Sequence, residues 1–176
     1  MISGKEIKKV LEWIKERYDN PCTRDVYESR LYSKLAILEL SGWVEGTLKD
    51  LAIRLIDKKL NDDAAKEEFK EVIRNIRGFR YERHFQDLLN KTVGFINREI
   101  IEKEISGKDY DKLEKFKTAL NNLSGRRNFY AHNFSHNPQK VPTTIDPSSV
   151  INYYEDILSG LEAFKEEIAK NQGISF

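Results

Sequence analysis

The 176-residue sequence contains one cysteine, four prolines and nine glycines, and it is almost free of net charge. A single cysteine, Cys22, excludes an internal disulfide and a cysteine-based zinc site, and it suits a reducing cytoplasm. No apolar run approaches the roughly 18 residues of a membrane span, and residues 1–10 lack the apolar core of a signal peptide. Because 30 Lys and Arg face 29 Asp and Glu, any binding of nucleic acid must depend on a local site. We therefore predict a cytoplasmic protein without a membrane segment.

The residues that are present favour an all-α fold. Hydrophobic residues make up 39% of the chain, enough for the core of a single domain over residues 1–176. Long stretches lack helix breakers, and alternating strand patterns are nearly absent, which indicates a bundle of five to six helices. The expected helices cover residues 3–19, 24–60, 64–77, 79–105, 110–134 and 147–170. Asp146 and Pro147 supply a cap and a first-turn proline for the last of them.

Two charged residues interrupt apolar rows that helical periodicity assigns to the core. Arg127 follows Leu113 and Leu120 at steps of seven, and Glu45 follows Leu38 in the same way. An unpaired charge in a core costs several kcal/mol, so each residue needs a partner or must line a cleft. We expect Arg127 and Glu45 to meet. A structural ion pair and a functional site are equally consistent with this spacing.

The segment after Arg127 adds residues that are suited to phosphate chemistry. Asn128 and His132 are four apart, on one strip of a helix, with Arg127 beside them. A guanidinium binds phosphate through paired hydrogen bonds, and an imidazole exchanges a hydroxyl proton near neutral pH. Together they could promote attack of an RNA 2′-hydroxyl on the adjacent phosphate, with Asn128 orienting the imidazole or binding the sugar-phosphate. For a single histidine such as His132 taken alone, a satisfied or exposed helix residue is the more common case.

The spacing Arg127-x4-His132, with Asn128 after the arginine and a small residue before the histidine, resembles the Arg-x4-6-His signature of the HEPN superfamily. These are small helical-bundle proteins of toxin and defence systems. Residues 35–56, which contain an acidic residue among apolar neighbours, look like an early HEPN helix. The motif also lies late in the chain and precedes a loop and a terminal helix. The resemblance covers most of residues 23–170 and implies a HEPN-like bundle.

The same resemblance implies a metal-independent endoribonuclease without a cofactor, active as a homodimer whose two motifs face each other. Arg127 and His132 would be the catalytic pair, Asn128 would give polar support, and Glu45 would be a supporting residue. A role as a toxin or defence effector, and an antitoxin partner such as a nucleotidyltransferase, also follow from the resemblance.

A different class of function competes with this one. Some HEPN proteins have lost activity, so the chain could be a non-catalytic module that binds RNA, a nucleotide or a partner protein. Arg127 and Glu45 would then be a buried pair. An accessible His132 favours the enzyme, and a His132 locked in an internal hydrogen bond favours the module.

A second basic feature precedes the motif in the chain. Arginines recur every three residues from Arg74 to Arg83, with aromatic residues between them, as on a surface that contacts an RNA backbone and stacks on bases. Arginines paired with nearby glutamates on a solvated surface would give the same pattern. We predict RNA contacts at Arg77, Arg80, Arg83, Arg126 and His136. His132 and His136 could chelate a metal only if the helix reached His136, and the nearby Pro138 argues against that, so no metal site is predicted.

Overall fold

The computed structural model describes residues 4–20, 25–132 and 145–174 of the chain. This part contains seven α-helices, one π-helical turn and no strand, which confirms the all-α prediction. In chain order the elements are α1 (Gly4–Asp19), α2 (Val26–Lys59), α3 (Asp63–Asn75), the π-helical turn η2 (Tyr81–Phe85), α4 (Gln86–Thr92), α5 (Phe95–Lys108), α6 (Tyr110–His132) and α7 (Pro147–Gln172).

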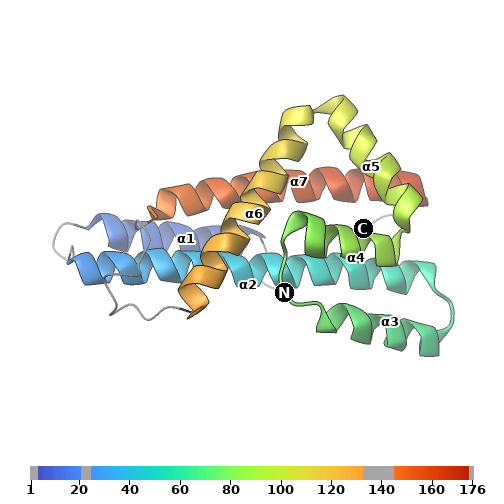
Figure 1. The fold of residues 1–176 in the computed structure, drawn as a ribbon, viewed down its shortest axis with the longest axis horizontal. Helices are drawn as coiled ribbons and strands as arrows, with labels where there is room; N and C mark the ends of the chain where they lie inside the picture. The colour runs from blue at the N-terminus through green and yellow to red at the C-terminus, as the bar shows by residue number, and fades with distance from the viewer. Residues whose placement is uncertain (1–3, 21–24, 133–144, 175–176) are drawn as a thin grey trace.

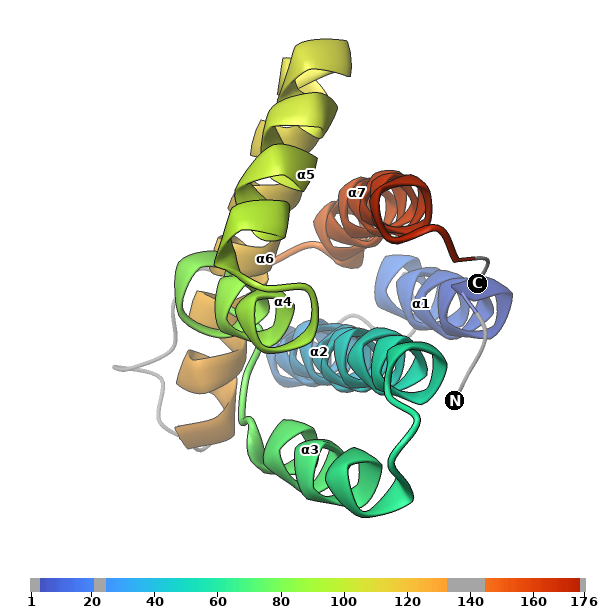
Figure 2. The same cartoon turned by 90° about the vertical axis from the view of Figure 1, so that its right-hand side faces the viewer.

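The bundle is built around the long helix α2. Figure 1 shows α1 and α7 running along α2, while α6 crosses it obliquely. In the end-on view of Figure 2, α3 lies below α2, and α4 and the C-terminal half of α6 lie to its left. The N-terminal half of α6 pairs with α5 in a hairpin that projects out of the bundle (Figures 1 and 2). The last turns of α6 therefore lie across α2, while the middle of α6 contacts the segment that joins α3 to α4 through Asn121 and Tyr81.

Aspartate side chains cap the starts of four helices, and in α6 the carboxylate of Asp109 accepts from the N–H of Lys112 at 2.9 Å. The carboxylate of Asp25 accepts a hydrogen bond from the backbone N–H of Tyr27 at 2.7 Å and opens α2. Asp62 caps α3 in the same way. Asp146 accepts from the N–H of Ser148 at 2.7 Å, and Pro147 occupies the first turn, so the predicted start of α7 is confirmed. Each cap satisfies a backbone donor that the helix itself leaves free.

The prediction of one helix over residues 79–105 is wrong, and this accounts for the higher number of helices. The chain leaves α3 at Asn75 and passes through Gly78, whose φ of +100° is a left-handed conformation that favours glycine. It then forms η2 and α4, and a second glycine, Gly94 at φ +84°, separates α4 from α5. Gly94 at positive φ therefore divides a segment whose hydrophobic pattern alone indicated a single helix, and Gly78 lies just before that segment.

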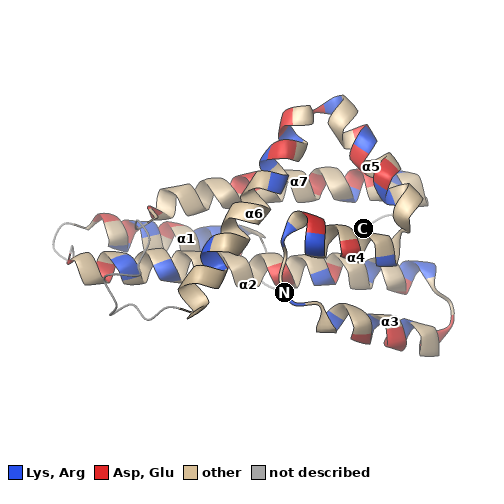
Figure 3. Ribbon diagram, in the orientation of Figure 1, with Lys and Arg blue, Asp and Glu red and all other residues tan. Residues whose placement is uncertain are grey.

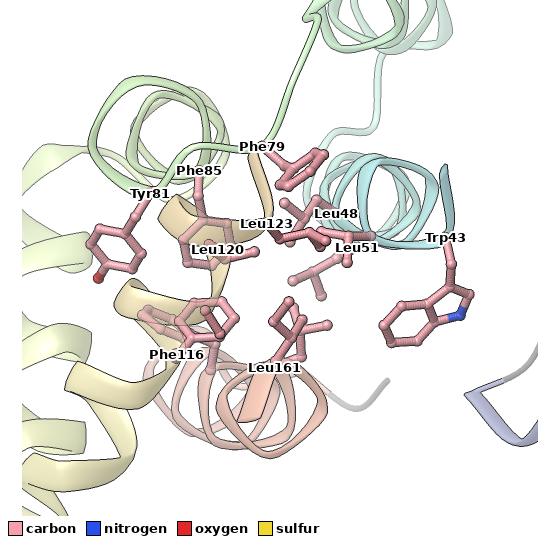
Figure 4. Packing of buried hydrophobic residues seen from close by; sticks show 14 of the residues in the cluster. Trp43, Leu48, Leu51, Phe79, Tyr81, Phe85, Phe116, Leu120, Leu123 and Leu161 are labelled. Carbon is pink, nitrogen blue, oxygen red and sulfur yellow. The ribbon is translucent and has the colours of Figure 1, made fainter. Parts of the chain in front are cut away.

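The core is continuous and rich in aromatic rings. Tyr81, Phe85, Phe116 and Phe164 form a cluster with ring centroids 4.9–6.5 Å apart. Figure 4 shows the side chains of α2, η2, α6 and α7 meeting in this interior. α6 and α7 lie close together at Gly160, where a side chain would collide with Phe116. This cluster holds η2 against α6 at Phe116.

Candidate functional site

The residues of the Arg-x4-His motif lie in the last two turns of α6. Asn128 and His132 are exposed, and Arg127 is half-buried. Nη1 of Arg127 donates a hydrogen bond to Oδ1 of Asn128 at 3.2 Å. Asn128 and His132 stand four residues apart, so they share one face of α6. The structure thus presents an amide and an imidazole side by side, with the guanidinium joined to the amide.

The ion pair expected between Arg127 and Glu45 does not form in the described part of the chain. Oε1 of Glu45 pairs with Nζ of Lys49 at 2.9 Å, one turn further along α2. Lys49 also donates to the backbone carbonyl of Arg74 at 3.2 Å, so this pair faces the end of α3. Arg127 is only half-buried because it lies near the end of α6, where fewer side chains cover the inward-facing row of the helix. Helical periodicity predicts that the side chains of Arg127 and Glu45 face inward. It does not predict which residues they contact.

The half-buried guanidinium is well suited to holding a phosphate. Arginine carries five N–H donors in a planar fork, and Asn128 accepts from Nη1 only. Partial burial strengthens the interaction of the fixed positive charge with an anion, because it removes part of the screening by water. The exposed His132 is in turn accessible to a hydroxyl group of a bound molecule.

Neighbouring contacts hold this end of α6 against the bundle. Tyr130 is buried, and its burial raises the pKa of its phenol, an effect that the nearby Arg126 opposes. Arg126 itself is half-buried. After the motif, the described chain resumes at Ile145, whose carbonyl accepts a hydrogen bond from the buried hydroxyl of Ser33 in α2 at 2.7 Å. The end of α6 and the start of α7 are thereby attached to the same half of α2.

The arginines at residues 77, 80 and 83 are all exposed, but they do not form one helical face. Arg77 and Arg80 lie in the extended stretch between α3 and η2, and Arg83 lies in η2. Arg74 belongs instead to α3, where it lies 3.8 Å from Glu67 and 3.9 Å from Glu71. Figure 3 shows basic residues both on this stretch and on the C-terminal half of α6, on the side of the molecule that faces the viewer.

Asn121 connects that stretch to α6. Its Oδ1 accepts from the backbone N–H of Tyr81 at 3.1 Å, and its Nδ2 lies 3.2 Å from both carboxylate oxygens of Glu82. The sequence alone does not identify Asn121, because an asparagine in mid-helix gives no local signal of a distant backbone partner. Its i+7 relation to Asn128 is the one feature that periodicity could have revealed.

His84 has a definite structural role that the sequence analysis did not assign. Its Nδ1 accepts a hydrogen bond from the backbone N–H of Arg80 at 3.0 Å. Burial lowers the pKa of His84, and the charges of Arg83 and Arg80 lower it further, while Glu45 and Asp87 oppose the shift. The ring also lies against Gly78, where a Cβ would come within 2.8 Å of it. A neutral imidazole therefore closes this turn.

His136 and Cys22 lie outside the described residues, so the prediction of an RNA contact at His136 stays a prediction. Among the residues that the structure does describe, no three or more His, Cys, Asp or Glu side chains are grouped so as to hold a metal ion. None of the helices within the described ranges is both long and apolar enough to cross a membrane.

Comparison with known proteins assigns the chain to a family. The family description RiboL-PSP-HEPN matches residues 4–170, which include all the elements named above up to the last turn of α7. The chain belongs to the RiboL-PSP-HEPN family. No curated protein and no solved structure matches it. Membership in the HEPN superfamily suggests a ribonuclease or another RNA-related function, and HEPN domains often bind RNA and dimerise.

Proposed function

We propose that this HEPN protein is a metal-independent endoribonuclease that cleaves RNA by attack of a 2′-hydroxyl on the adjacent phosphodiester. The observation that carries the proposal is the exposure of His132 at the end of α6, on the same face as Asn128, to which Arg127 is hydrogen-bonded. An accessible imidazole beside a partly buried guanidinium provides a base and an anion-binding group without a metal.

In the proposed reaction, His132 accepts the proton of the 2′-hydroxyl while O2′ forms a bond to phosphorus. The bond between phosphorus and the 5′-oxygen breaks, that oxygen takes a proton from water and leaves as a 5′-hydroxyl, and His132 returns its proton to the solvent. The other product carries a 2′,3′-cyclic phosphate. Arg127 holds the negative charge that grows on the non-bridging oxygens, and Asn128 keeps the guanidinium in place. Glu45, paired with Lys49, supports α2 and does not take part in proton transfer.

The biological setting proposed for this activity is that of a toxin or defence effector in the cytoplasm. A homodimer would bring two motifs and their arginines together, which would compensate for a net charge of only +1. Arg126 and His136, next to the motif in the chain, would add contacts to the RNA backbone. An antitoxin such as a nucleotidyltransferase would restrain the enzyme by covering this face.

Cleavage of RNA in excess chelator tests the proposal. We expect the wild-type protein to cut, and His132→Ala and Arg127→Ala to lose about 10²- to 10⁴-fold in rate, as is usual when a general acid–base or charge-stabilising group is removed. Arg74→Gln is the matched control, because Arg74 is an exposed arginine already neighboured by Glu67 and Glu71. Circular dichroism must show that each variant folds.

Two results would contradict the proposal. Cleavage that survives the loss of His132 or Arg127 would mean that other groups perform the reaction. A folded wild-type protein that binds RNA and cuts none of a varied set would instead indicate the non-catalytic module.

A further inference from the structure

Three exposed arginines lie in a short segment that we call the arginine segment, residues 77–84. Arg77, Arg80 and Arg83 have no carboxylate within ion-pair distance among the described residues, whereas the neighbouring Arg74 lies close to two glutamates. All three side chains are exposed, so their donors are available to another molecule.

The backbone of the arginine segment is held in place by buried side chains on either side of Arg80. Phe79 and Tyr81 are each 1% exposed. Figure 4 shows the ring of Phe79 beside Leu48, and the centroid of the Tyr81 ring lies 5.9 Å from that of Phe116. The hydroxyl of Tyr81 also donates to Oε1 of Glu102 at 3.0 Å. Arg80 lies between two anchored residues, so little backbone entropy remains to be lost when it binds a ligand.

The turn is closed by contacts that are specific to this sequence. Gly78 adopts φ +100°, and the His84 ring occupies the space that a side chain at position 78 would need. His84 Nδ1 accepts the N–H of Arg80, which requires the unprotonated nitrogen and so the neutral ring. η2 is itself a π-helical turn, a form that is rare in proteins and frequent at functional sites.

The position of the segment relative to the motif follows from Asn121. This residue is bonded to Tyr81 and Glu82, and it lies on the same face of α6 as Asn128 and His132, seven and eleven residues before them. At 1.5 Å per residue, these steps correspond to about 10 and 17 Å along the helix. The distance matches several nucleotides of an RNA strand rather than one.

We propose that the arginine segment is a preformed clamp for the RNA backbone, that His84 is its positioning residue, and that the substrates are single-stranded oligonucleotides long enough to reach from the clamp to His132. The predictions that are measured by cleavage rest on the function proposed above. The predictions that are measured by RNA binding do not depend on it. Three phosphates held by arginines beside the middle of α6 would place a fourth linkage near Arg127 and His132.

Binding is measured first, with a fluorescent RNA decanucleotide and the His132→Ala protein, so that cleavage plays no part. We expect Arg80→Gln to weaken binding by up to about fivefold, the range of one exposed ion pair. Replacing all three arginines by Gln should also reduce the slope of log K against log salt by about 2, because each phosphate contact to a single strand contributes about 0.7. Arg74→Gln, the matched control, should do neither.

Variants of His84 separate positioning from simple stability. His84→Ala should weaken RNA binding as Arg80→Gln does, while His84→Asn, whose Oδ1 takes the place of Nδ1 as an acceptor, should restore it. In the active protein, the arginine variants should raise KM and leave kcat unchanged, which is the sign of lost uniform binding. The loss in kcat/KM should be larger for a decanucleotide than for a dinucleotide.

The clamp and the nuclease can fail separately. If RNA is cut but Arg80→Gln binds no more weakly than Arg74→Gln, the clamp is refuted and the nuclease stands. If no RNA is cut but the arginine and His84 variants lose binding as described, the nuclease is refuted and the clamp stands. Equal losses for dinucleotide and decanucleotide would also overturn the clamp, because a dinucleotide cannot reach it.

Discussion

α6 and α7 lie close together at Gly160, and replacing this glycine with alanine tests their packing directly. A Cβ at this position would lie 2.3 Å from Cδ2 and 2.6 Å from Cβ of Phe116. Ordinary contacts between carbon atoms are 3.5–4.0 Å, so one of the two helices would have to shift by about 1 Å. Phe116 cannot turn aside, because its ring is fully buried and lies 5.3 Å from that of Phe85 and 5.4 Å from that of Phe164.

The magnitude follows from two opposing effects. Overpacking a rigid core costs about 1–3 kcal/mol, and alanine in place of glycine inside a helix returns about 1 kcal/mol. Since the predicted clash involves the ring near its attachment to the backbone, we expect the upper end of the cost and a net destabilisation of about 2 kcal/mol. Gly42→Ala is the matched control: Gly42 lies in the middle of α2 and has no atom within 4 Å of an added Cβ. It should stabilise the fold by up to about 1 kcal/mol.

Urea unfolding, followed by fluorescence of the buried Trp43, measures both variants. A change of 2 kcal/mol moves the midpoint by about 1 M, so the two substitutions should shift it in opposite directions. If Gly160→Ala unfolds at the same urea concentration as the wild type, the close approach of α6 and α7 is refuted.

Two further predictions concern a buried phenol and a helix cap. Burial and the neighbouring Glu102 raise the pKa of Tyr81 above its ordinary 10.0. Above pH 10 the folded state therefore keeps a proton that the unfolded state loses. The free energy of unfolding should then fall by up to about 1.4 kcal/mol per pH unit as the pH rises. Tyr81→Phe removes the hydrogen bond to Glu102, so it should lower the free energy of unfolding by about 1 kcal/mol near neutral pH. In urea unfolding, the stability of this variant should fall less steeply with alkaline pH than that of the wild type. An unchanged alkaline slope would contradict this. Asp146→Ala should destabilise the fold by about 1 kcal/mol by uncapping α7, and Asp146→Asn, which can still accept the hydrogen bond, should not.

Local sequence signals were sufficient for the regular helices. Asp146 and Pro147 mark the start of α7, and the apolar stripe of Ile7, Leu11 and Ile14 defines the buried face of α1. Both depend on residues a few positions apart, so periodicity and capping rules describe them. The break at Gly94 could not be predicted in the same way, because a glycine within a helical pattern shows its positive φ only when the packing of α4 and α5 requires it.

At the candidate site, too, local relations could be predicted from the sequence and long-range contacts could not. The sequence places Asn128 and His132 on one strip of α6, because that relation is local. The partner of Glu45 is Lys49, and the choice depends on how α2 faces the end of α3, a long-range arrangement that residue spacing does not encode. For the same reason, the contacts of Asn121 with Tyr81 and of His84 with Arg80 emerge only from the folded chain.

The central claim is that His132 and Arg127 promote attack by the 2′-hydroxyl of RNA, and the most direct test removes that hydroxyl at one nucleotide. After the cleavage site of an oligonucleotide has been mapped in excess chelator, the same sequence is made with a 2′-deoxy nucleotide on the 5′ side of the cut. The account predicts that cleavage at this linkage disappears, and that the unmodified RNA yields a 2′,3′-cyclic phosphate and a 5′-hydroxyl. Cleavage of the deoxy linkage at the same rate, or a 5′-phosphate on the product, would show that water attacks instead and would contradict the account.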